Sequence, residues 1–323
     1  MFEILRRDLV LSAAGACAAF GLNAPIAFIG AAEAQERGQA YRKHKIGDIE
    51  VISLVDGLLE APQREGWITN ASVDQTKAAL RAAGLTDAHV PIPFTALAIN
   101  MGDRLVLIDT GTGGSPPYPP QSGLLVQSMA AAGLDPKNVK TILISHLHGD
   151  HIYGLMNKDT NEQLFPDAEI IVPAAELKWW TRPEVDGMDL GPTRKGLSQR
   201  IRNTMAAWKN VRPVDDGEAD LIAGVRAIPA AGHSPGQVAH LVSSGTQHLL
   251  VTADVSLLPA LFVRNPEWQV RLDQDPLMAV ETRKRIFARA VADKLMITGT
   301  HWLLPSVGTI AKDGHGYAFT PAA

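Results

Sequence analysis

Four side chains that commonly bind metal ions stand within six residues of this chain: His146, His148, Asp150 and His151. They directly follow the β-rich run 139–144, which we expect to form a buried strand. Imidazole and carboxylate groups at the end of one strand can converge on cations without helical regularity, and together they suit zinc, iron, manganese or cobalt. A single histidine is usually a surface or core residue, but four ligand types at this spacing predict a catalytic metal site.

One loop of this kind cannot close a site for two metals, so further ligands must come from distant parts of the chain. His233, Asp254 and His301 are the candidates, because each follows an apolar run and is flanked by small or turn-forming residues. Each of the three alone would be more typical of a structural role. Together with the loop 146–151 they complete the pattern of a site for two metal ions.

The first 34 residues differ in kind from the rest of the chain. Arg6 and Arg7 precede a mostly apolar run from Leu9 to Ile29, and residues 32–34 place alanine at the two positions that a signal peptidase reads. This pattern predicts an export signal over residues 1–34, and the paired arginines resemble a twin-arginine signal. An ordinary Sec signal and an uncleaved anchor helix are the alternatives.

Cys17, the only cysteine, lies inside this signal, so the mature chain offers no thiolate as nucleophile, disulfide partner or metal ligand. The missing thiolate disfavours a purely structural zinc site. No linker after Gln35 marks a boundary, and we therefore expect one domain over residues 35–323. The protein would be periplasmic or secreted, with no stable membrane anchor after processing.

The charge balance bears on the class of partner. The formal net charge is −4, and the sequence has no run of five like charges that would suggest a basic face. Nucleic-acid binding usually needs such a face, so we expect a small-molecule substrate and no nucleic acid. A homodimer is compatible with the sequence.

Short apolar runs outnumber helical patterns and often follow one another without an intervening helix, and the first of them ends at a turn signal, Asp56-Gly57. The expected strands are 49–55, 94–100, 105–108, 139–144, 169–172, 225–228, 238–242, 248–252 and 295–298, and the expected helices are 73–85, 122–132, 174–180, 197–208 and 276–292. This order predicts an α/β (α+β) protein, a four-layer αβ/βα sandwich of two mixed β-sheets flanked by helices.

The ligand pattern His146-x-His148-x-Asp150-His151, followed by His233, Asp254 and His301, resembles the metallo-β-lactamase superfamily. The resemblance implies that His146, His148 and His233 hold one metal ion. It implies that Asp150, His151 and His301 hold a second ion and that Asp254 bridges the two. Two divalent ions are expected, zinc first, with manganese, cobalt or iron as alternatives. Asp109 fits the family's aspartate turn and would orient a ligand histidine.

The C-terminal third most resembles methyl parathion hydrolase and its lactonase and arylesterase relatives. The stretches that carry the likeness are Asp254–Leu258, Leu272–Asp275, Ala279–Lys284, His301–Pro305 and Gly316–Phe319. This resemblance implies a hydrolase for neutral lactones, aryl esters or organophosphate triesters. A β-lactamase or glutathione-thioester hydrolase of the same fold, and a non-catalytic periplasmic metal-binding protein, are the alternatives.

The candidate catalytic residues are Asp150 and Asp254. In such a hydrolase a metal-activated hydroxide attacks carbon or phosphorus. Asp254 would set the separation of the two ions, and Asp150 could also take up a proton. A metal-activated hydroxide makes a serine nucleophile unnecessary, and we expect Ser122 and Ser234 to be turn and cap residues.

Five aromatic residues are candidates for the substrate pocket: Tyr118, Trp179, Trp180, Phe262 and Trp302. Ordinary core packing is the alternative for each of them. Trp302 is the strongest candidate because it adjoins His301. An aromatic pocket without an obvious cationic cluster suits an uncharged ester or lactone.

The remaining histidines, His44, His89, His240, His248 and His315, lack partners at ligand spacing. We expect them to be structural.

Overall fold

The computed structural model describes residues 39–102, 104–190, 194, 196–215 and 217–322. The predicted export signal over residues 1–34 lies outside this part of the chain. Within it, no helix combines the length and the apolar character that crossing a membrane requires.

Two seven-stranded mixed sheets form the centre of the protein. The first sheet follows the order of the chain, with antiparallel pairing from β1 to β4 and parallel pairing from β4 to β7. Its strands are β1 (Tyr41–Ile46), β2 (Ile49–Pro62), β3 (His89–Asn100), β4 (Leu105–Ile108), β5 (Val139–Leu143), β6 (Glu169–Pro173) and β7 (Val211–Val214).

The second sheet is built from the C-terminal part of the chain in the order β14-β13-β12-β11-β10-β9-β8. Its strands are β8 (Ala219–Ile222), β9 (Val225–Pro229), β10 (Val238–Ser244), β11 (Gln247–Val251), β12 (Met296–Thr298), β13 (Gly308–Asp313) and β14 (Gly316–Pro321). The β11–β12 pair is parallel and the other pairs are antiparallel.

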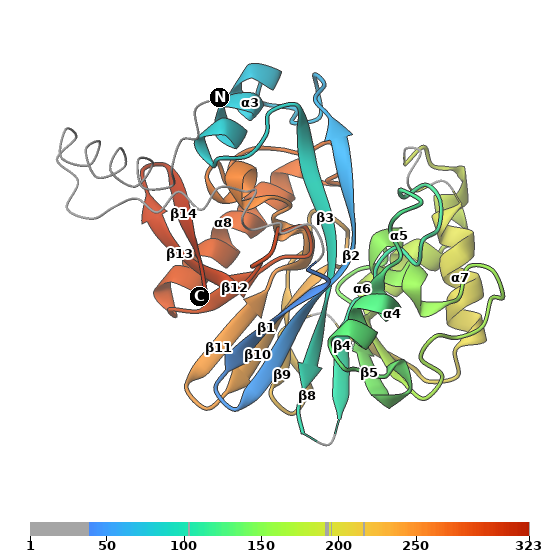
Figure 1. Ribbon diagram of the computed structural model, residues 1–323. Helices are drawn as coiled ribbons and strands as arrows, with labels where there is room; N and C mark the ends of the chain where they lie inside the picture. The colour runs from blue at the N-terminus through green and yellow to red at the C-terminus, as the bar shows by residue number, and fades with distance from the viewer. Residues whose placement is uncertain (1–38, 103, 191–193, 195, 216, 323) are drawn as a thin grey trace, which may run out of the picture.

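Helices cover the outer faces of both sheets (Figure 1). The helices are α3 (Val73–Ala82), α4 (Leu125–Ala131), α5 (Gly149–Ile152), α6 (Ala174–Thr181), α7 (Leu197–Ala207) and α8 (Pro276–Ala292). Residues of α4, α6 and α7 pack on the first sheet, and residues of α8 pack on the second. The predicted four-layer sandwich is therefore confirmed.

Alternation along the strands explains the layers. In β4, Leu107 packs under the helices of the first sheet, whereas its neighbour Val106 packs between the sheets. In β11, Leu250 packs against α8 and Val251 faces the first sheet. Successive side chains of a strand point to opposite faces, so each strand contributes to two apolar cores.

The prediction of a turn at Asp56-Gly57 is wrong. β2 continues through these residues to Pro62 and shifts register between Val55 and Gly57. The buried Asp56 carboxylate accepts hydrogen bonds from the backbone amides of Thr112 (2.8 Å) and Leu125 (3.0 Å). These distant partners hold the segment in the sheet, and the local turn chemistry does not decide its conformation.

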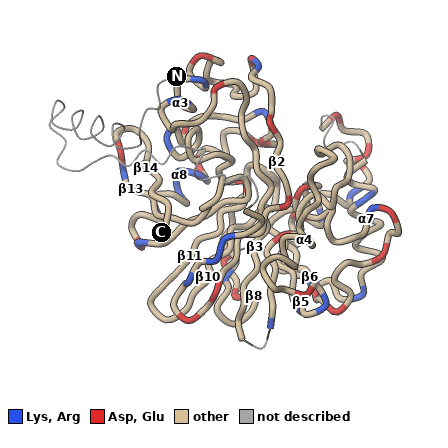
Figure 2. Tube along the Cα trace, in the orientation of Figure 1, with Lys and Arg blue, Asp and Glu red and all other residues tan. Residues whose placement is uncertain are grey.

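Figure 2 shows Lys and Arg interspersed with Asp and Glu around the periphery in this view.

Candidate metal centre

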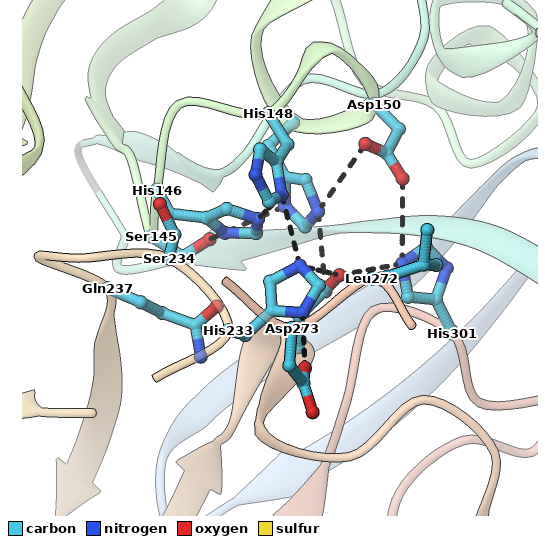
Figure 3. A network of polar contacts seen from close by, with 12 residues as sticks. Ser145, His146, His148, Asp150, His233, Ser234, Gln237, Leu272, Asp273 and His301 are labelled. Atoms are coloured by element: carbon cyan, nitrogen blue, oxygen red, sulfur yellow. Dashed lines mark hydrogen bonds and ion pairs between the residues drawn. The ribbon is translucent and has the colours of Figure 1, made fainter. Parts of the chain in front are cut away.

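All seven predicted ligand side chains come together at one edge of the sandwich, where strands of both sheets end (Figure 3). His146 and His148 follow β5, and Asp150 and His151 lie on α5. His233 lies between β9 and β10, Asp254 in the short turn after β11, and His301 after β12. The backbone amide of Val238 donates to the Ser145 carbonyl (3.0 Å), which ties the loop after β5 to the second sheet.

Three imidazoles form the first group. His148 Nδ1 lies 2.9 Å from His146 Nε2 and 3.0 Å from His233 Nε2. Three ring nitrogens from two loops thus face one point and could serve as ligands of one ion. Burial lowers the pKa of His146 and His148 well below its usual range, so both rings are neutral, as metal ligands must be.

The second group joins Asp150, His151 and His301. His301 Nε2 lies 3.5 Å from Asp150 Oδ2, and His151 Nε2 lies 3.9 Å from Asp150 Oδ1. A carboxylate oxygen and two imidazole nitrogens are again a ligand set that suits zinc and similar divalent ions.

Asp254 lies between the two groups. Its Oδ2 atom is 3.2 Å from His233 Nε2 and 3.1 Å from His301 Nε2, and its Oδ1 atom is 3.3 Å from His151 Nε2. Burial alone would raise the pKa of this carboxyl, but His301, His151 and His233 together hold it well below its usual range. Asp254 is therefore ionised and touches histidines of both groups.

The polar atoms of the site fit bound cations. Asp254 Oδ1 and His151 Nε2 are buried, and apart from their 3.3 Å contact with each other they have no hydrogen-bond partner among the described residues. Burying polar atoms without partners is unfavourable. Burial lowers the pKa of His151, but Asp254, Asp109 and Asp150 outweigh it and raise that pKa well above the usual value. This excess of negative charge around His151 is the environment that a cation would neutralise.

Three acceptors orient the ligand-type histidines from behind. His151 Nδ1 donates to Asp109 Oδ2 (2.8 Å), His233 Nδ1 to Asp273 Oδ1 (2.9 Å) and His301 Nδ1 to the Pro93 carbonyl (2.7 Å). Each bond leaves the Nε2 lone pair free to face the site. The Asp109 contact was expected. The sequence analysis assigned no role to Asp273, and the Pro93 acceptor is a backbone atom, which no sequence pattern marks.

Asp109 adopts a left-handed backbone conformation with φ 59°. This conformation is uncommon for residues other than glycine and is typically kept where function requires it. It allows the carboxylate to accept hydrogen bonds from the Ser145 amide (2.8 Å) and hydroxyl (2.7 Å) as well as from His151.

Glu176 of α6 is a residue that the sequence analysis missed. Its buried carboxylate accepts hydrogen bonds from the amides of Leu147 (3.0 Å) and Gly236 (2.7 Å), from Trp180 Nε1 (2.9 Å) and from the Ser234 hydroxyl. Leu147 lies between two ligand histidines, and Ser234 follows a third. Glu176 thus joins the two loops of the first histidine group, and no ligand-like spacing in the sequence marks it.

Three of the five predicted pocket residues are core residues, and their assignment to the pocket is wrong. Trp180, Phe262 and Trp302 have 0% of their surface exposed. Trp302 Nε1 donates to the Ser256 carbonyl (3.0 Å), and its ring packs edge-on against Phe319. His301 and Trp302 are neighbours in the chain, but only His301 contacts the aspartates of the site.

Tyr118 and Trp179 remain partly exposed near the site. The Tyr118 hydroxyl donates to Asp150 Oδ1 (3.0 Å). Trp179 lines a pocket of about 590 Å³, together with Leu190, Arg194, Arg271 and Met278.

The expectation of a pocket without a cationic cluster is wrong, because Arg194 and Arg271 both line this pocket. Burial lowers the pKa of Arg194, while the carboxylates of Asp150, Asp273 and Asp254 act in the opposite direction. Arg194 therefore lies within electrostatic reach of the candidate metal centre. The two arginines are far apart in the sequence, so no sequence pattern joins them.

Comparison with known proteins agrees with the fold and the site. Residues 95–292 match the metallo-beta-lactamase superfamily, and the chain belongs to this superfamily. With the histidine and aspartate cluster at the edge of its two sheets, it is a hydrolase of that superfamily.

Two solved structures share most of the architecture. AidC, a dizinc quorum-quenching lactonase, is 23% identical with a TM-score of 0.80, over 88% of this chain and 98% of its own. AbOPH, a hydrolase in the beta lactamase superfamily, is 25% identical with a TM-score of 0.80, over 89% and 99%. Ribonuclease Z of Pyrococcus furiosus is 38% identical over 60 residues, which are 19% of this chain and 16% of that enzyme.

Proposed function

We propose that the protein is a binuclear metal-dependent hydrolase of neutral lactones, aryl esters or organophosphate triesters. The observation that carries this proposal is the position of Asp254. One of its oxygens lies 3.2 Å from His233 and the other 3.3 Å from His151, which belong to the two different histidine groups. A carboxylate so placed is suited to bridge two ions.

The seven residues would divide as the superfamily resemblance implies. His146, His148 and His233 would hold one ion, Asp150, His151 and His301 the other, and Asp254 both. Two divalent ions, zinc first, supply Lewis acidity and a strong nucleophile at neutral pH when they are bound.

The chain's own groups would orient the substrate and handle protons. Asp150 is held by the Tyr118 hydroxyl at 3.0 Å and is 13% exposed, so it can accept a proton from the reaction and pass it to solvent. Asp109, Asp273 and the Pro93 carbonyl keep three imidazoles in fixed tautomers, which preserves the geometry of the site through the reaction.

The pocket beside Trp179 supports an uncharged substrate that carries carbonyl groups. Trp179, Leu190 and Met278 offer apolar surface to an acyl or aryl group. Arg194 and Arg271 can donate hydrogen bonds to a carbonyl or phosphoryl oxygen. The lactonase activity of AidC, which has the same fold, motivates placing lactones first. We further propose export to the periplasm or beyond, on the basis of the pattern in residues 1–34.

A substrate screen tests the proposal. Metal-loaded protein is assayed on an acyl-homoserine lactone, dihydrocoumarin, p-nitrophenyl acetate, a phosphotriester, a glutathione thioester and a β-lactam. We expect the highest kcat/KM on the lactones or the aryl ester, and loss of that turnover in Asp254→Ala. The matched control is Asp220→Ala, which removes a surface carboxylate paired with Arg226 (2.8 Å).

The screen separates the alternatives. A preference for the β-lactam or the thioester would contradict the substrate class. Turnover of none of the compounds by protein that carries two metal ions would indicate a metal-binding protein without hydrolase activity.

A further inference from the structure

A second cavity, of about 190 Å³, lies between the two sheets at the side where β7 and β8 form their edges. Its walls are mostly apolar, with Ile144, Ile171 and Val172 from one sheet and Leu221, Ala227 and Val238 from the other. None of the seven candidate metal ligands lines it. It is therefore a separate space behind the ligand loops.

Two buried polar side chains line this cavity. His240 of β10 is 0% exposed, and neither of its ring nitrogens has a hydrogen-bond partner among the described residues. Gln237 is 1% exposed, and its Oε1 atom likewise has no partner there. Gln237 is labelled in Figure 3, in the same view as the histidines of the candidate metal centre.

The unpaired atoms of His240 and Gln237 indicate that a molecule with a polar group binds in this cavity. Nearly all buried donors and acceptors in proteins are hydrogen-bonded, and leaving them unpaired is unfavourable. Burial lowers the pKa of His240 from 6.5 to about 4, so its imidazole is neutral and offers one donor and one acceptor. Gln237 Oε1 adds a second acceptor on the same wall.

The walls restrict the charge and the size of that occupant. No lysine or arginine is among the described residues that line the cavity, and Asp215 is, so an anion is disfavoured. An apolar cavity of about 150 Å³ holds benzene in another protein, so this cavity is large enough for one aromatic ring.

We propose that this cavity is a binding site for a small uncharged molecule with an apolar ring and one hydroxyl group, a compound of the phenol class. The ring contacts the aliphatic side chains of both sheets. The hydroxyl hydrogen-bonds to His240 and Gln237. This site does not depend on the proposed hydrolysis, because none of its lining residues belongs to the metal centre.

Methyl NMR of the full metal-loaded protein tests the proposal, with phenol as the probe. We expect phenol to cause saturable shifts of the methyl groups of Ile144, Ile171 and Val172. Toluene, which lacks the hydroxyl, should bind about tenfold more weakly, as the loss of one hydrogen bond predicts. Benzoate should leave these methyl groups unshifted.

Two variants localise the effect. His240→Leu should remove the preference for phenol over toluene, while the control His248→Leu, which alters a histidine bonded to Ser243 on the neighbouring strand, should keep it. Ala227→Leu should fill the cavity and abolish binding of both probes.

Three results would each overturn the proposal. In the first, a saturating concentration of phenol shifts no methyl group of the cavity. In the second, toluene binds to the parent protein as tightly as phenol does. In the third, Ala227→Leu still binds both probes. The first of them would indicate that water alone occupies the space.

Discussion

Asp254 Oδ2 lies 3.1 Å from Nε2 of His301, although the two residues are 47 positions apart in the chain. They follow β11 and β12, which are parallel and paired in register from Leu249 with Met296 to Val251 with Thr298. Parallel strands end at the same edge of a sheet, so residues just beyond the two strands meet. The sheet topology thus brings together two ligands that no local motif connects.

Glu176→Gln should weaken metal binding by the first histidine group. All four groups that contact the Glu176 carboxylate are hydrogen-bond donors. The glutamine side chain replaces one acceptor oxygen by an NH₂ group, which cannot accept a hydrogen bond from these donors. Loss of such supporting contacts typically lowers metal affinity by about 10- to 100-fold. Competition with a chromophoric chelator measures the change.

Glu169→Gln is the matched control, since Glu169 is a partly exposed glutamate of β6 paired with Arg212 (2.9 Å). Equal metal affinity in the two variants would show that Glu176 does not position the ligand loops.

The stability of the protein should fall between pH 6.5 and about 4 partly because of His240, whose pKa is lowered from 6.5 to about 4. Across this interval the unfolded chain takes up a proton that the folded protein does not, so acid favours unfolding. His240→Leu removes this effect. Between pH 7 and pH 4 the free energy of unfolding should fall in both proteins, and the fall should be roughly 3 kcal/mol smaller in His240→Leu than in the parent protein.

Chemical denaturation at a series of pH values measures the difference, with His248→Leu as the control. Parallel pH profiles for the parent protein and His240→Leu would contradict a buried, neutral His240.

Trp179→Ala should affect substrate preference, whereas Trp302→Ala should affect stability. Trp179 lines the large pocket, so its truncation should change the ratio of kcat/KM for a lactone to that for a phosphotriester, with metal content unchanged. Trp302 is fully buried, so its truncation should cost about 3–5 kcal/mol of stability. A parental substrate ratio in Trp179→Ala would show that this pocket does not bind the substrate.

Replacement of Arg6 and Arg7 together by lysine should leave precursor in the cytoplasm, because a twin-arginine signal requires its arginine pair. Fractionation followed by immunoblotting measures the distribution. Unchanged periplasmic yield would indicate the Sec route.

The sequence predicted those parts of the fold and site that depend on local pattern. Apolar runs that are closely followed by histidine or aspartate predicted the strands β5, β11 and β12, and the structure brings these ligand-type residues together. The superfamily resemblance then supplied the expected division of His233, Asp254 and His301 among two ions.

Features that depend on tertiary contacts were beyond the sequence. In the sequence Glu176 looks like any glutamate of a helix, and its role depends on the Leu147 and Gly236 amides that donate to it in the folded protein. Trp302 adjoins a ligand, yet its ring packs into the core beside Phe319. Trp179 lies on α6 and Arg194 lies after that helix in the chain, and only the folded protein brings both to the wall of the same pocket.

The metal content of gently purified protein, measured by plasma mass spectrometry, tests the central claim most directly. The two histidine groups joined by Asp254 predict about two equivalents of divalent transition metal per chain, and about one or fewer in Asp254→Ala. A metal content near zero in parent protein that stays fully active in excess chelator would contradict the binuclear site.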